Sequence, residues 1–117
     1  MWLIRLFQYD GKTFVPQSNS SNGEVSAGTI FQYRQDGNIL TGTYQGGSIQ
    51  SGVLVGTVNK DGALHFRYHH VSKDGSMRSG SCHSTPKQLD NGKIQLFEKW
   101  KWMDGDQSEG ESVIVEQ

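Results

Sequence analysis

Residues 49–85, IQSGVLVGTVNKDGALHFRYHHVSKDGSMRSGSCHST, carry the pattern that decides the fold. Polar and apolar residues alternate along three runs, and the dipeptides Asp61-Gly62 and Asp74-Gly75 separate these runs. Alternation is the period of a half-buried β-strand, and Asp-Gly between two such runs is a strong local signal for a β-hairpin. This stretch therefore predicts three consecutive antiparallel strands.

Turn dipeptides of the same kind also occur before and after that stretch. Turn dipeptides also fall at Asp36-Gly37, Gly46-Gly47, Asn91-Gly92 and Asp104-Gly105. The predicted strands are residues 12–18, 29–35, 38–44, 49–58, 63–71, 77–85, 93–102 and 106–116. No segment repeats at helical spacing. Eight antiparallel strands in sequence order predict an all-β up-and-down meander barrel, with an open curled sheet or a sandwich as the alternative.

Length, charge and hydropathy narrow the class of protein. A chain of 117 residues holds one domain, so we assign residues 11–117 to a single barrel. We treat residues 1–10 as an N-terminal extension: an extra strand, a tail packed on the body, or the product of an upstream start codon. A mean hydropathy of -0.61 argues against a membrane protein, and a net charge of -1 provides no basic field for nucleic acid.

The single cysteine, Cys82, cannot form an internal disulfide. This fits a reducing compartment, and we expect a cytoplasmic protein. The apolar start of the chain, residues 1–7, is too short to span a membrane and is not followed by a signal-peptide cleavage site.

Hairpin geometry predicts which side chains point into the barrel, because directly opposite residues of an antiparallel pair share a face. The predicted pairs are Gly56 with Phe66, Leu54 with Tyr68, Gly52 with His70, Tyr68 with Gly80, Phe66 with Cys82, Cys82 with Trp100, Ser84 with Glu98, Phe31 with Gly42, Tyr33 with Leu40, Leu96 with Ser112 and Ile94 with Ile114. These pairs agree on one interior face, where the glycines leave room for large rings.

The direction of each strand predicts which end of the barrel each interior side chain lies near. Leucine and isoleucine gather near the turns at residues 37, 62 and 92, whereas aromatic and polar side chains gather at the other end, under the loop 19–28. The candidate ligand-binding residues are Tyr44, Tyr68, His70, Glu98, Trp100 and Trp102, with Tyr33 and Ser84 higher up in the barrel. An aromatic and polar mouth under a loop is typical of a ligand site. The alternative is a filled core whose polar groups satisfy one another.

The sequence gives little support for metal binding or catalysis. Alternation turns His65, His69 and His83 outward but His70 and Cys82 inward, and no metal-ligand spacing occurs, so we expect neither a metal nor a cofactor. His70 together with Glu98 could act as acid and base on a bound molecule. That pair keeps an isomerase or a hydrolase as an alternative.

Several motifs carry a resemblance to a known family: residues 22–26 (NGEVS), 31–35 (FQYRQ), 67–70 (RYHH), 80–82 (GSC) and 98–102 (EKWKW). From about residue 7 to 116 the chain resembles a family of short, largely uncharacterised bacterial proteins, and this implies a calycin-like, lipocalin-like or avidin-like barrel. Some members carry the automatic label N-acetylglutamate synthase. We disfavour that activity here, because an acetyltransferase of the usual kind needs a helix-flanked sheet.

The function predicted from these observations is binding of a small apolar or aromatic molecule inside a cytoplasmic bacterial barrel, without nucleic acid or membrane as a partner. Aromatic rings would stack on the molecule, and Glu98, His70 and the tyrosine hydroxyls would fix its polar groups. Two alternatives remain: the enzyme that uses His70 and Glu98, and an interaction module with a filled core whose outer face forms a homodimer or another contact.

Overall fold

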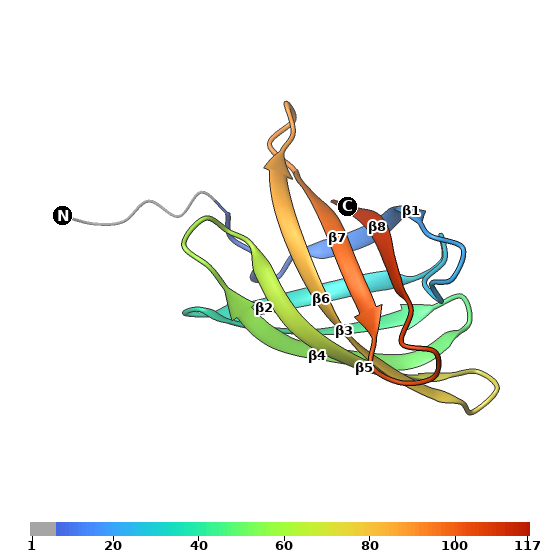
Figure 1. Ribbon diagram of the computed structural model, residues 1–117. Helices are drawn as coiled ribbons and strands as arrows, with labels where there is room; N and C mark the ends of the chain where they lie inside the picture. Colours follow the sequence, from blue (N-terminus) through green and yellow to red (C-terminus); the bar gives the residue numbers. More distant parts are fainter. Residues whose placement is uncertain (1–6) are drawn as a thin grey trace.

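The computed structural model describes residues 7–117, which form a closed barrel of eight antiparallel strands in sequence order (Figure 1). The strands are β1 (Thr13–Asn19), β2 (Ile30–Asp36), β3 (Ile39–Gly46), β4 (Ile49–Val58), β5 (Leu64–Ser72), β6 (Met77–Gln88), β7 (Ile94–Trp102) and β8 (Glu109–Glu116). The predicted all-β meander barrel is therefore confirmed. Across the described residues there is no helix long and apolar enough to span a membrane.

Pairing of the first strand with the last closes the barrel. Phe14 of β1 lies opposite Glu116 of β8, and the register shifts between Pro16 and Ser18. Proline has no N–H to donate to a ladder, so it is tolerated beside such an irregularity. Closure leaves no long unpaired strand edge in the barrel.

The predicted registers hold for the central strands. Tyr68 lies opposite both Leu54 and Gly80, and Cys82 lies opposite both Phe66 and Trp100. Alternation accounts for this result: in β7 every second side chain, from Ile94 to Trp102, is buried. The interior face is thus the one that the hairpin geometry predicts.

Two predicted registers are wrong by two residues, although the interior face is unchanged. In β2 and β3, Tyr33 lies opposite Gly42 and Phe31 opposite Tyr44, because the turn consists of Gly37 and Asn38, not of Asp36 and Gly37. A shift by two residues preserves the face of a strand, whereas a shift by one residue would reverse it.

The second wrong register joins β7 and β8. Leu96 lies opposite Ile114, and Glu98 lies opposite Ser112. The connection spans residues 103–108 and is longer than the predicted three-residue turn at Asp104-Gly105. Trp102 N donates to Ser108 O (2.9 Å), and Gln107 takes a φ of 54° inside the loop. Asp-Gly marks the loop correctly, but the sequence carries no sign of this second left-handed residue.

One end of the barrel is filled by apolar side chains. Leu40, Leu64, Leu96 and Ile114 are fully buried there, together with Tyr9 from the segment before β1. The Tyr9 hydroxyl donates to Gly62 O (2.6 Å), and Gly11 N donates to Tyr33 O (3.0 Å). The part of the predicted N-terminal extension that the structure describes, residues 7–10, therefore includes a core side chain, and residues 1–6 lie outside the described residues.

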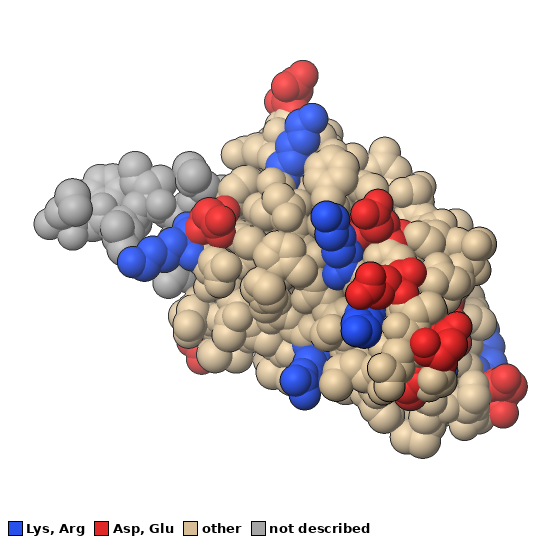
Figure 2. Space-filling model, in the orientation of Figure 1, with Lys and Arg blue, Asp and Glu red and all other residues tan. Residues whose placement is uncertain are grey.

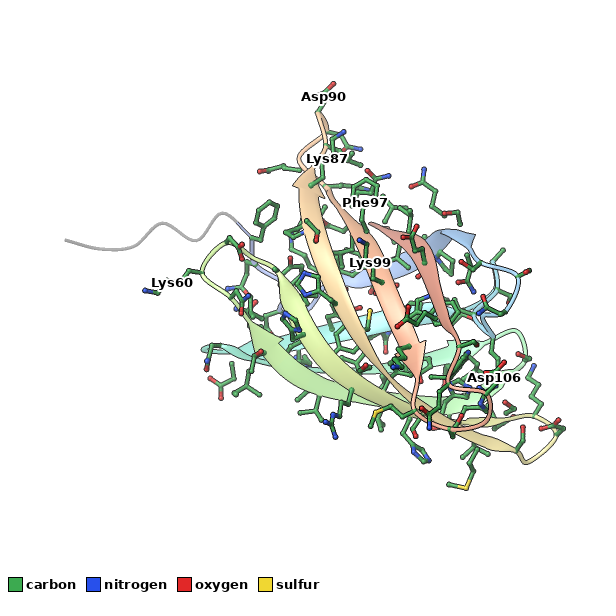
Figure 3. The ribbon with its side chains drawn as sticks, in the orientation of Figure 1. Lys60, Lys87, Asp90, Phe97, Lys99 and Asp106 are labelled. Carbon is green, nitrogen blue, oxygen red and sulfur yellow. The ribbon has the colours of Figure 1, made fainter. Side chains whose placement is uncertain are left out.

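The connections divide between the two ends, which we call the closed end and the mouth. Figure 3 places Lys60 and Asp90 at turns of the closed end and Asp106 in the 103–108 loop at the mouth. On the face drawn in Figure 2, acidic and basic side chains are interspersed among uncharged residues. This surface presents no extended field of one sign.

Candidate functional site

A cavity of about 50 Å³ lies inside the mouth, beneath the connection between β1 and β2. That connection, residues 20–29, is called the mouth loop below. The cavity is lined by Asn19, Gly23, Glu24, Val25, Phe31, Tyr44, Leu54, Phe66, Tyr68, His70, Cys82, Glu98, Trp100, Trp102 and Ser112. A volume of this size has room for a few water molecules or for part of a small ligand.

Six of the eight predicted site residues line this cavity: Tyr44, Tyr68, His70, Glu98, Trp100 and Trp102. The other two lie outside its lining. Ser84 is fully buried and donates to the Glu98 carboxylate, and the buried Tyr33 hydroxyl has no hydrogen-bond partner within residues 7–117. The strands therefore gather six of the predicted residues at the mouth. Ser84 and Tyr33 lie nearer the closed end, where Ser84 pairs with Leu64 and the Tyr33 ring packs against that of Tyr9.

Aromatic rings form one wall of the cavity. The ring of Trp102 meets those of Tyr68, His70 and Trp100 edge to face, with centroid separations of 5.6, 5.9 and 5.7 Å. Such edge-to-face contacts hold the rings in place. Gly110 of β8 makes room for the ring of Trp100, because a Cβ atom at this position would overlap that ring.

The Glu98 carboxyl group forms the polar floor of the cavity. Ser112 Oγ donates to its Oε1 (2.9 Å), and Ser84 Oγ donates to Oε2 (3.2 Å). Burial raises the pKa of Glu98 to about 7, and the hydrogen bonds from Ser112, Ser84 and Cys82 offset only part of this effect. Glu98 thus changes its charge near neutral pH, within an otherwise largely apolar interior.

His70 is held at both ring nitrogens. Its Nε2 donates to Glu24 Oε1 (2.8 Å), and its Nδ1 shares a hydrogen bond of 2.8 Å with the Tyr44 hydroxyl. The imidazole is 2% exposed, so these two bonds fix its orientation at the rim of the cavity. Burial raises the pKa of the Tyr44 hydroxyl, which therefore remains protonated and can donate to Nδ1.

Glu24 joins the mouth loop to β5 and β6. Its Oε2 accepts from Arg78 Nη1 (2.8 Å), and its Oε1 also accepts from Ser72 Oγ (3.3 Å). Partial burial alone would raise the pKa of Glu24, but hydrogen bonds from His70 and Arg78 outweigh that effect and lower it. Glu24 is therefore ionised at neutral pH and ties the loop to the barrel.

Arg78 is itself fixed by other partners. Its Nε donates to Asp104 Oδ1 (2.7 Å), and its guanidinium carbon lies 3.9 Å from the centroid of the Trp102 ring. The hydrogen bonds with Asp104 and Glu24 raise the pKa of Arg78 against the opposing effect of burial. The guanidinium is thereby held over the ring of Trp102.

Neither Glu24 nor Arg78 is among the residues that sequence analysis predicts for the site. Arg78 lies opposite the inward-facing His70, so alternation places it on the interior face of β6. Its guanidinium reaches the ring of Trp102 from that face. A signal for Glu24 is present in the chain: it is the one charged residue between positions 13 and 33. A lone carboxylate in a polar loop above a cavity is a candidate for contact with that cavity.

His70 and Glu98 have separate hydrogen-bond partners. His70 bonds Tyr44 and Glu24, whereas Glu98 bonds Ser84, Ser112 and the thiol of Cys82. A general acid and a general base must both reach the atoms of one substrate. Here the histidine is engaged at the rim and the carboxyl group at the floor.

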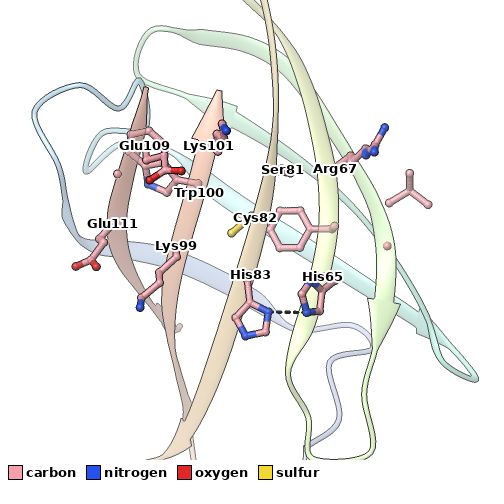
Figure 4. Close-up of a pocket in the computed structure, with 14 residues that line it drawn as sticks. His65, Arg67, Ser81, Cys82, His83, Lys99, Trp100, Lys101, Glu109 and Glu111 are labelled. Carbon is pink, nitrogen blue, oxygen red and sulfur yellow. Dashed lines mark hydrogen bonds between the residues drawn. The ribbon is translucent and has the colours of Figure 1, made fainter. Parts of the chain in front are cut away.

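A second hollow, of about 910 Å³, lies on the outer face of β4 to β8 (Figure 4). His65 and His83 meet there through a 2.7 Å hydrogen bond between ring nitrogens, close to Lys99 and Glu111. Within residues 7–117, no group of three or more His, Cys, Asp or Glu side chains could hold a metal ion. This hollow is open to solvent and carries charges of both signs, so the aromatic cavity under the mouth loop is the better candidate for a ligand site.

Comparison with known proteins gives one match. The family model described as "Avidin-like protein" matches residues 7–117. Neither the curated proteins nor the solved structures give a significant match. The family match covers all eight strands and the mouth loop, so it includes every residue of the cavity described above.

Proposed function

Since this chain belongs to the avidin-like protein family, we propose that its barrel binds a small molecule in the cavity at the mouth. An eight-stranded barrel is wide enough either to be filled by side chains or to hold one small ligand. Here aromatic rings line one end and leave a cavity between them. The closed end is filled, so the mouth is the route by which a ligand would enter.

The observation that carries the proposal is a buried acceptor at this cavity. Asn19 Nδ2 donates to Val25 O (2.8 Å), but Asn19 Oδ1 has no hydrogen-bond partner within residues 7–117. Asn19 also lines the cavity. Buried polar atoms are nearly always paired, by protein, by water or by a ligand. A ligand donor placed in the cavity would satisfy this oxygen.

The lining indicates the chemistry of such a ligand. Trp100, Trp102, Tyr68 and Phe66 favour an apolar or aromatic body, because flat rings pack well against aromatic side chains. The Glu98 carboxyl group favours an N–H or O–H group at the deep end of that body. We therefore propose a small, flat molecule with at least one hydrogen-bond donor.

Tryptophan fluorescence tests this proposal, because Trp100 and Trp102 line the cavity. A Trp2→Phe background removes emission from the one tryptophan outside the described residues. Titration with phenylacetamide, a neutral ring with an N–H donor, is expected to change the emission in a saturable way. The Ser112→Leu variant fills the cavity wall and is expected to weaken this binding at least about tenfold.

Lys99→Leu is the matched control, because this substitution introduces the same side chain, leucine, on the exposed outer face of β7. It should leave the titration unchanged, and thermal melting should show that both variants fold. A flat titration curve for the Trp2→Phe protein, repeated with indole and benzyl alcohol as further neutral probes, would refute a ligand cavity at this end.

A further inference from the structure

The Glu24 carboxylate occupies a site built by three donors of the barrel strands. His70 and Ser72 belong to β5, and Arg78 belongs to β6. Their contacts to Glu24 measure 2.8, 3.3 and 2.8 Å. A cation and two further donors that converge on one carboxylate form a site for an anion.

Two of these three donors are held in place by partners other than Glu24. Arg78 is fixed by Asp104 and by the Trp102 ring, and His70 is fixed by the Tyr44 hydroxyl. The strands and these second contacts remain when Glu24 leaves. The donor set is therefore preorganised for an anionic group of any origin.

Both ends of the mouth loop are tied to the barrel: Ser20 Oγ donates to Glu111 O (2.9 Å), Asn22 Nδ2 donates to Glu109 O (2.9 Å), and Thr29 Oγ1 donates to Gly46 O (3.0 Å). The middle of the loop, residues 23–28, is held less firmly: besides the Glu24 side chain, Asn19 Nδ2 donates to Val25 O (2.8 Å) and Ser48 Oγ donates to Glu24 O (3.3 Å). The same loop covers the cavity with Gly23 and Val25. A cavity of about 50 Å³ is much smaller than the roughly 300 Å³ of an ordinary ligand pocket. Entry of a ligand thus requires the loop, and Glu24 with it, to move outward.

From these contacts we infer that Glu24 is an internal competitor: the ligand is a small organic anion whose acidic group replaces the Glu24 carboxylate on His70, Ser72 and Arg78. This inference rests on the proposed ligand cavity and adds the charge of the ligand to it. The aromatic body of the anion enters the cavity as the loop leaves. Glu24 keeps the mouth closed until an acid of suitable shape displaces it.

Two nearly isosteric probes separate the charge from the body. Phenylacetate carries a carboxylate, and phenylacetamide carries a neutral amide on the same benzyl group. Glu24→Ala removes the competitor and is expected to strengthen phenylacetate binding at least about tenfold. The ligand then no longer has to break the hydrogen bonds between the Glu24 carboxylate and the barrel strands. Phenylacetamide must open the same loop, so its affinity should also rise in Glu24→Ala, and the preference for phenylacetate over phenylacetamide should remain.

Arg78→Gln removes the cation of the site and is expected to abolish the preference for phenylacetate over phenylacetamide. Glu111→Ala is the matched control, because it removes one negative charge on the exposed outer face of β8. It should leave both affinities within about twofold of the parent protein. If Arg78→Gln does not fold, Ser72→Ala replaces it with a smaller expected loss of the same preference.

The outcomes distinguish this inference from the proposed function. Binding of both probes with equal affinity in the parent, Glu24→Ala and Arg78→Gln proteins would overturn the anion site while the cavity stands. Absence of binding by either probe to any of the proteins would overturn the cavity and the anion site together. A gain for phenylacetate in Glu24→Ala, together with a preference over phenylacetamide that Arg78→Gln removes, supports the inference.

Discussion

The two segments that flank β1 cover opposite ends of the barrel in different ways. Residues 7–12 cover the closed end, where Tyr9 is fully buried and its hydroxyl bonds a backbone oxygen of Gly62. Residues 20–29 cover the mouth, where Glu24 holds the loop through side-chain contacts to His70 and Arg78. One cover is an aromatic side chain in an apolar core, and the other is a carboxylate on a rim that is partly exposed.

The two covers therefore have different roles: the closed end stabilises the fold, and the mouth loop controls access to the cavity. Burial of a large apolar surface contributes several kcal/mol and cannot be exchanged for a solute. A charged contact that is partly exposed contributes little net stability, and another ion can replace it. The closed end thus maintains the barrel, and the mouth is suited to open at small cost.

Tyr9→Ala tests the first half of this contrast. We expect the free energy of unfolding to fall by about 3–5 kcal/mol, because the substitution removes a fully buried ring from the core. Tyr9→Phe should cost only about 1 kcal/mol, for the hydrogen bond to Gly62 O. Urea unfolding provides both values.

Val25→Ala is the comparison at the mouth, since Val25 lines the cavity and is only half-buried. We expect it to cost less than about 1 kcal/mol. Equal costs for Val25→Ala and Tyr9→Ala would contradict the distinction between the two covers.

The Glu98 carboxyl group predicts a dependence of stability on pH. Its pKa is about 7 in the folded protein, against an ordinary value of 4.5, so the folded state binds the extra proton between these values. The free energy of unfolding should therefore fall as the pH rises from about 4.5 to 7, by at most about 3 kcal/mol, and level off above. Glu98→Gln should remove this component.

The measurement is urea unfolding of both proteins across this pH range, with the difference between the two curves as the readout. Glu24 has the opposite sign: its lowered pKa contributes stability above pH 4.5 that is lost as the pH falls. Glu24 is present in both proteins, so its effect cancels in the difference. Parallel curves for the parent protein and Glu98→Gln would show that Glu98 stays ionised in the fold.

Glu24→Gln should have the smallest effect on global stability, below about 1 kcal/mol, because Glu24 and Arg78 are partly exposed and the glutamine oxygen can still accept from His70. Its local effect should be clear in hydrogen exchange. We expect faster exchange of the mouth-loop amides of Gly23 and Thr29, whose acceptors lie within the same loop, and unchanged exchange of Gly11 and Gly62 at the closed end. A uniform change at both ends would instead indicate global destabilisation.

Alternation and turn dipeptides together predict the fold almost completely. The side chains of β7, from Ile94 to Trp102, alternate so regularly that the buried face follows from the sequence. Registers depend on which turn residues take a left-handed φ, and the errors arose there. Gly37 with Asn38 forms the turn between β2 and β3, and Gln107 at 54° extends the loop after β7.

The site is less predictable than the fold, because part of it comes from a loop and not from a strand. Residues that face inward from a strand, such as Trp100 and His70, follow from the period of two. Arg78 follows from the same period, because it lies opposite the inward-facing His70. Glu24, in contrast, reaches the cavity from a loop without a period, although its isolated charge is visible in the sequence.

The burial of Cys82 has a consequence for following the protein over time. It is the single cysteine of the chain, its side chain lines the cavity, and burial raises the pKa of its thiol. A thiol reagent reacts with the thiolate, so the closed barrel resists labelling. The rate at which such a reagent modifies Cys82 therefore reports how often the barrel opens, without any engineered label, and a molecule seated beside the sulfur would slow that rate.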